Sequence, residues 1–197
     1  MTRRSYDVAM NLRSWIIADL ESLRRRLVEG VLTMIPHERR AERVDGGGIA
    51  PTYILWHLTR HHDVAVNRIV RGVDEVVDSW TDRLGMSEDL WRGLAEGEDN
   101  EVVDIVDPEV VDAYALAVVD ATMSWIDSAD LALLDSRPDT GSALHALGVP
   151  EERFGWLYDM WQGQPASFFL GWEGIGHSVN HLGELVSIRN RMGLSPF

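Results

Sequence analysis

The chain contains no cysteine and no lysine, and all 18 of its basic residues are arginine. Without cysteine, disulfide frameworks, thiolate metal sites, iron–sulfur clusters and cysteine nucleophiles are excluded. Without lysine, Schiff-base catalysis and the phosphate-binding lysine of a P-loop are excluded. Any thiolate that takes part in chemistry here must therefore come from a second molecule.

Long apolar runs are also missing. No stretch approaches about 18 uninterrupted apolar residues, so we expect no transmembrane helix. Residues 1–7 are not followed by an apolar signal core, and we expect a cytoplasmic location. The formal charge is −14, from 32 acidic and 18 basic residues. Because such a surface repels phosphate backbones and anionic lipids, we expect neither a nucleic-acid partner nor a membrane partner.

The composition is otherwise that of a globular protein, with 45% hydrophobic and 25% charged residues in 197. This length predicts a single domain spanning residues 1–197. Strand-like alternation is scarce, and apolar residues recur at helical spacing in four long segments. These segments are Asp7–Val31, Pro51–Arg71, Pro108–Leu134 and Pro165–Met192. Shorter helices are expected in the long connections, at Ser87–Leu94, Ser142–Leu147 and Glu151–Trp161. The pattern predicts an all-α four-helix bundle with long crossover connections.

Histidines carry the strongest chemical signal. His177 and His181 are four residues apart on the last helix, a rotation of about 400° that places both imidazoles on one face. His57 on the second helix offers a third ring. A divalent cation would satisfy the lone pairs of three such imidazoles and keep a coordination position open, as in catalytic zinc sites. The alternative is that the pair only flanks the core.

Helical geometry ranks the neighbours of His57 on the second helix. Relative to His57, His61 lies within about 100° on the apolar side, whereas His62 is about 140° away. We therefore expect His61 to point inward, as a fourth ligand or a substrate contact. For His62 two alternatives remain: a local distortion of the helix that lets the ring point inward, or a position at the edge of a groove. We expect Asp63 on the far, solvated side of the helix.

Two segments resemble a known family. Ile54-Leu55-Trp56-His57-Leu58-Thr59-Arg60-His61 is similar to the second-helix motif of the DinB/YfiT-like metalloenzymes, which include the mycothiol-dependent maleylpyruvate isomerases and related thiol transferases. Residues 177–185 and 188–193 are similar to their final helix. The resemblance implies a four-helix bundle with a zinc or nickel ion on His57, His177 and His181, although some relatives have glutamate at the first of the last two positions. It also implies a possible homodimer.

By this resemblance the chain is a metal-dependent enzyme acting on a small molecule, with a low-molecular-weight thiol as cosubstrate in S-transfer or isomerisation. Hydrolysis by a metal-bound hydroxide is the nearest enzymatic variant. The alternatives are a non-catalytic, stress-related protein that binds a metal or another ligand, and a bundle that a metal ion only holds together.

Further side chains near the expected ligands are candidates for supporting roles. Glu173 and Glu184 could orient an imidazole or shuttle a proton as catalytic groups, or form surface ion pairs instead. Trp56 and Asn180 could line the pocket for a cofactor or substrate, or contribute only to packing.

Overall fold

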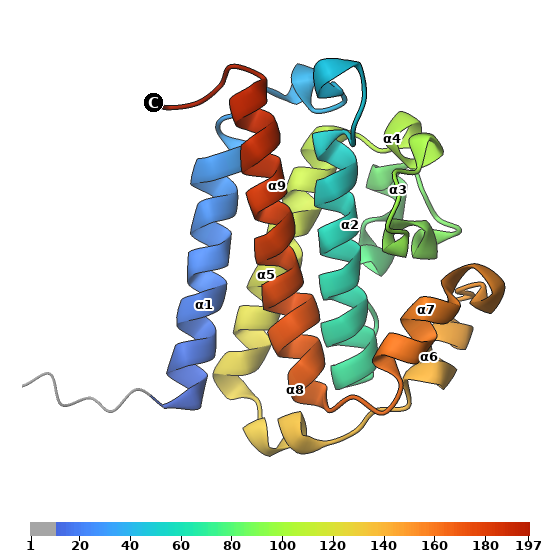
Figure 1. Ribbon diagram of the computed structural model, residues 1–197. Coiled ribbons are helices and arrows are strands. Elements are labelled where there is room, and N and C mark those ends of the chain that lie inside the picture. Colours follow the sequence, from blue (N-terminus) through green and yellow to red (C-terminus); the bar gives the residue numbers. More distant parts are fainter. Residues whose placement is uncertain (1–10) are drawn as a thin grey trace, which may run out of the picture.

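The computed structural model describes residues 11–197, in which four long helical segments lie side by side (Figure 1). They are built on α1 (Leu12–Leu27), α2 (Pro51–Asp63), α5 (Pro108–Ser128) and α9 (His177–Arg191). Helices α2 and α5 run in one direction, and α1 and α9 in the other. No strand is present among the described residues, so the predicted all-α fold class is confirmed.

The second and last predicted helices are continuous but change their winding. α2 continues as a π-helical segment, Val64–Arg71, up to Gly72, whose positive φ of 62° ends the helix. Before α9, the short helix α8 (Ala166–Phe168) leads into a second π-helical segment, Phe169–Gly176. The chain between Pro51 and Arg71 and between Ala166 and Arg191 is thus helical throughout, as the apolar spacing predicts.

The predicted third helix is too long at its C-terminal end. α5 ends at Ser128, because Ala129 is extended and the Asp130 side chain accepts a hydrogen bond from the N–H of Ala132. Asp130 thereby caps a separate 3-10 turn over Leu131–Asp135. The expected start of the first helix at Asp7 lies outside the described residues.

The two long connections fold against the bundle and bury α2. Residues 73–107 form α3 (Thr81–Leu84), a 3-10 segment (Leu90–Leu94) and α4 (Asn100–Ile105). The second connection contains α6 (Thr140–Ala146) and α7 (Glu151–Trp161). All of them lie on the side of α2 that faces away from α1 (Figure 1). As a result, every residue of α2 is buried. Among residues 11–197, none of the helices combines the length and the apolar character that a bilayer crossing requires.

The prediction of a solvated Asp63 is wrong. Asp63 is fully buried and accepts hydrogen bonds from the Tyr114 hydroxyl at 2.6 Å and from the N–H groups of Val76 and Val77 at 3.0 and 2.9 Å. The first connection passes over this face of α2, so the carboxylate ties that connection to the helix. The periodicity of a single helix carries no information about a segment that returns to cover it.

Of the two positions predicted for His62, the groove edge is wrong. His62 is buried, and its Nε2 lies 2.9 Å from the Thr122 hydroxyl of α5. Gly174 packs closely on the other side, since a Cβ built there would lie 3.5 Å from His62 Nε2. Because α2 is covered on all sides, it has no groove edge that could hold this imidazole.

We predict that Asp63→Asn destabilises the fold strongly. The asparagine amide has the size of the carboxylate but lacks its negative charge, which lies 3.4 Å from Arg60. Its NH₂ group would also face hydrogen-bond donors that the Asp63 carboxylate accepts from. Breaking a buried ionic contact of this kind costs about 3–5 kcal/mol. Urea unfolding measures the loss.

The matched control is Asp74→Asn in the same connection, whose side chain is 92% exposed and 3.8 Å from Arg68. Removing an exposed pair of this kind changes the unfolding free energy by about 1 kcal/mol or less. Equal effects of the two substitutions would contradict the buried role of Asp63.

Candidate metal centre

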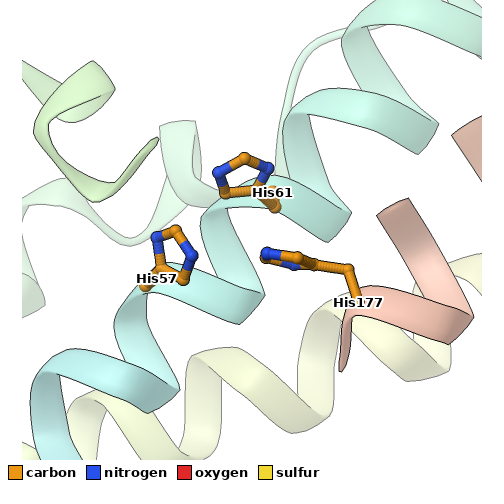
Figure 2. Close-up of side chains that lie close together, drawn as sticks. All are labelled: His57, His61 and His177. Carbon is orange, nitrogen blue, oxygen red and sulfur yellow. The ribbon is translucent and has the colours of Figure 1, made fainter. Parts of the chain in front are cut away.

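Four imidazoles meet between α2 and α9: His57 and His61 from α2, and His177 and His181 from α9. The ring centroids of His57 lie 4.6 Å from His61, 5.0 Å from His177 and 4.7 Å from His181. His177 is 4.5 Å from both His61 and His181. Figure 2 shows His57 and His61 on α2 facing the ring of His177 from α9. The structure thus brings the three predicted ligands together and adds His61.

The π-helical segments adjoin these rings. One begins directly after α2 and the other ends at Gly176, immediately before His177, and the two segments pack against each other. Widened helical turns of this kind are frequent at functional sites. Glu173 lies in the second π-helical segment and His177 directly follows it, and both contact the ring of His61. Helical periodicity in the sequence does not reveal the π-helical winding.

Hydrogen bonds at the Nδ1 atoms fix two of the rings. His57 Nδ1 lies 2.8 Å from the carbonyl oxygen of Gly93, and His181 Nδ1 lies 3.0 Å from Glu184 Oε2. Both oxygens are acceptors, so in each neutral ring Nδ1 carries the hydrogen and Nε2 keeps its lone pair. His57 Nε2 is buried without a hydrogen-bond partner.

The contact between the two α9 imidazoles points to a shared cation. His181 Nε2 lies 3.1 Å from His177 Nε2. Since the His181 nitrogen presents a lone pair, either a proton from His177 or a cation must lie between the two atoms. His177 Nδ1 is buried without a partner. The orphaned His57 Nε2 and the facing pair of nitrogens are donor atoms that suit a divalent ion, so these residues fit a metal.

His61 belongs to a second possible ligand set. His57, His61 and His177 are all buried, and one nitrogen from each lies within 4.8 Å of the others, so this group could hold a metal ion. Both nitrogens of His61 also face oxygen acceptors: Nδ1 lies 3.0 Å from Glu173 Oε2, and Nε2 lies 3.4 Å from the Leu94 carbonyl. His57 and His177 are common to both sets.

Burial keeps His57 and His177 neutral. Loss of solvation, reinforced by the neighbouring His61 and His181, lowers the pKa of His57 to about 2. Burial and the same kind of neighbours also lower the pKa of His177 well below its ordinary value. Neutral imidazoles are the form in which histidine binds metals. The cluster is therefore ready to coordinate an ion near neutral pH.

The two glutamates contact different rings. Glu173 is fully buried, and besides His61 it accepts a hydrogen bond from Trp161 Nε1 at 2.7 Å. Glu184 is at the rim with a side chain that is 41% exposed, next to His181, whose side chain is 22% exposed. Each carboxylate thus orients one imidazole, and Glu173 is not a surface ion pair. Trp161, at the end of α7, had no distinguishing signal among the eight tryptophans of the sequence.

The two other predicted pocket residues directly adjoin ligand positions in the sequence. Trp56 is fully buried, with its ring 5.9 Å from that of Tyr114 and 5.9 Å from the Arg60 guanidinium carbon, and its Nε1 has no hydrogen-bond partner. Asn180 is exposed on α9. Gly93, which sequence reasoning missed, supplies the carbonyl that fixes His57.

Comparisons with known proteins establish the fold alone. No protein-family model and no curated protein matches the chain. Among solved structures, it is similar to the crystal structure of a conserved protein from Enterococcus faecalis, with 18% sequence identity and a TM-score of 0.63. The match covers 94% of this chain and 99% of that one. The two proteins share one helical architecture over nearly their full lengths.

We predict that Gly93→Ala disturbs His57. A Cβ at position 93 would lie 2.4 Å from Arg60 Cγ and 2.5 Å from Trp56 Nε1. The backbone must move away, which takes the carbonyl from His57. Overpacking of this kind costs about 1–3 kcal/mol, and loss of the hydrogen bond should lower the affinity for a divalent metal ion about 10- to 100-fold. Urea unfolding and chelator competition measure the two effects.

Gly97→Ala in the same connection is the control, because nothing lies within 4 Å of a Cβ at position 97. Gly97→Ala should leave the unfolding free energy and the metal affinity nearly unchanged. If Gly93→Ala also left both unchanged, the close approach of Leu90–Leu94 to α2 would be refuted.

We predict that His62 makes the metal-free protein sensitive to acid. Burial lowers the pKa of His62 to about 4, whereas an unfolded histidine has a pKa of about 6.5. Between these values the unfolded state binds more protons, so the unfolding free energy falls as pH decreases from 6.5 to 4. The contribution of one such group approaches about 1.4 kcal/mol per pH unit.

Urea unfolding in EDTA at several pH values between 4.5 and 7 measures this dependence. His62→Gln, which still offers a polar group to Thr122, should reduce the slope by about one proton. An unchanged slope would show that His62 does not titrate differently in the two states.

Proposed function

We propose that this chain is a divalent-metal-dependent enzyme that acts on a small molecule with a low-molecular-weight thiol of the mycothiol type as cosubstrate. The observation that carries the proposal is the convergence of buried imidazole nitrogens from α2 and α9, with His57 Nε2 unpartnered and His177 Nε2 3.1 Å from His181 Nε2. The reaction is S-transfer or thiol-assisted isomerisation, and zinc or nickel is the expected ion.

His57, His177 and His181 would hold the ion, with His61 as the alternative third ligand. A divalent ion on neutral imidazoles lowers the pKa of a thiol or water bound to it and so supplies an anionic nucleophile near neutral pH. The Gly93 carbonyl and Glu184 hold His57 and His181 in the tautomer that presents Nε2. These hydrogen bonds leave the rings little reorganisation to undergo when an ion binds.

The thiol must come from outside, since the chain has no cysteine. The motif resemblance around His57 and His177 favours a thiol over water as the nucleophile. The rim of the site supports proton transfer, because Glu184 is partly exposed and its Oε2 contacts His181 Nδ1. Glu184 Oε2 can take up a proton and release it to solvent.

A second candidate is non-catalytic metal binding, and the fourth imidazole favours it. If His61 and His181 both joined His57 and His177 on one ion, no coordination position would remain open. Zinc sites with four protein ligands are structural. Such a protein would bind the metal tightly and turn over no substrate.

We predict that protein purified without a histidine tag takes up about one equivalent of zinc or nickel. His57→Ala and His177→Ala should abolish uptake, because both rings belong to either ligand set. His145→Ala, with a side chain that is 60% exposed, is the control and should bind like the wild type. Elemental analysis after dialysis measures the content, and less than about a tenth of an equivalent in the wild type would overturn the proposal.

Activity separates the two candidates. We expect the metal-loaded protein to show a rate that depends on mycothiol, bacillithiol or glutathione in a panel of electrophiles, and His177→Ala to lose it. Metal binding without turnover across the panel would favour the non-catalytic candidate. A sharp fall in melting temperature on EDTA treatment would favour it too, since a structural ion contributes directly to folding.

A further inference from the structure

Glu173 is a buried carboxylate in an unusual setting. The buried carboxylates Asp63 and Glu75 share the guanidinium of Arg60, and Asp112 pairs with Arg40. Glu173 instead accepts hydrogen bonds from Trp161 Nε1 at 2.7 Å and His61 Nδ1 at 3.0 Å. Burying a carboxylate is costly unless positive charge lies nearby. A metal ion held by the imidazoles next to Glu173 would supply this positive charge.

The imidazole of His61 lies between Glu173 and the other rings of the candidate metal centre. The ring of His61 contacts Glu173 on one side, and its centroid lies 4.6 Å from that of His57 and 4.5 Å from that of His177. Glu184 also borders the cluster, but its side chain is 41% exposed, so water screens its charge. Glu173 has no such screening, since it has no exposed surface.

We propose that Glu173, held in place by Trp161, is the buried counter-charge of the metal centre and restricts the ligand that completes the centre to a single negative charge, as on a thiolate. This inference rests on the proposed function. With His57, His61 and His177 as the ligands, His61 would present Nε2 to the ion and donate Nδ1–H to Glu173, and a divalent ion together with Glu173 would leave one positive charge unmatched. One monoanionic ligand then makes the buried centre neutral, whereas a dianion would leave a buried net charge.

Glu173→Gln alone changes both charge and hydrogen bonding. Each oxygen of Glu173 accepts from a different donor, so the NH₂ group of glutamine must face either Trp161 or His61. The double variant Trp161→Phe/Glu173→Gln removes this conflict, because the amide oxygen can still accept from His61 while the NH₂ group faces a phenyl ring. The double variant therefore isolates the loss of charge. Trp161→Phe alone keeps the charge.

The experiment loads each protein with Co²⁺ and titrates it with azide, a monoanion, while recording visible absorption. Competition with a chelator gives the Co²⁺ affinity. In the double variant we expect Co²⁺ to bind about 10- to 100-fold more weakly and azide about three- to tenfold more tightly. If Glu173 only contributed to packing, its loss would weaken the binding of both Co²⁺ and azide. A weaker Co²⁺ affinity with a stronger azide affinity therefore indicates a counter-charge.

The controls distinguish the effect of removing the Glu173 charge from the effect of disturbing the fold. Glu21→Gln removes an exposed carboxylate of α1 and should change neither affinity. Trp161→Phe should keep the azide affinity within about twofold of the wild type. Far-UV circular dichroism and melting temperature of the metal-free proteins verify that each variant folds. If Glu173→Gln alone does not fold, the double variant is compared with Trp161→Phe.

Unchanged affinities in the double variant, or a parallel loss of both, would overturn the counter-charge. So would a wild-type protein that binds Co²⁺ but shows no azide band, because no position would then exist for the anion. A wild-type protein that binds no Co²⁺, zinc or nickel would overturn the proposed function itself.

Discussion

Desolvation of imidazole is the constraint on which the site depends. His57 and His177 are placed where water cannot solvate a charged ring, and the pKa of His57 falls to about 2 as a result. A neutral ring has one N–H donor and one lone pair, and both need partners when buried. The Gly93 carbonyl satisfies the donor of His57, so its Nε2 lone pair is left without a partner, and His177 Nδ1 is unpartnered as well. Helix packing around α2 thus leaves imidazole nitrogens that could hold a metal ion.

The helical segments and the pairing of His177 with His181 could be predicted from sequence because they depend on spacing within one helix, whereas His57 was assigned to the same ion by the motif resemblance. The separation of His177 and His181 fixes their common face, and Pro51 and Gly72 mark the ends of the second helical segment. Spacing within one helix does not tell where two helices contact each other in the folded protein. The sequence offered a shared ion as one interpretation of the spacing, and the structure supplies the distances.

The residues that sequence reasoning misjudged share one cause. Asp63 was expected in solvent, a groove edge was one of two positions left open for His62, and Gly93 and Trp161 were not singled out. Each of these environments is created by a different segment: the first connection covers Asp63, α5 reaches His62, and α7 brings Trp161 to Glu173. A helical pattern describes one element in isolation, so it cannot include what packs against it.

The supporting hydrogen bonds also set the order in which the protein matures. His57 and its carbonyl partner are 36 positions apart in the chain, whereas His61 and Glu173 are 112 positions apart. During translation α2 therefore emerges with its imidazoles hydrated and able to take up protons, long before α7 and α9 exist. Only when the last helix docks are the rings stripped of water and turned toward one another. The donor atoms of the candidate metal centre are thus brought together only after the last helix has been synthesised.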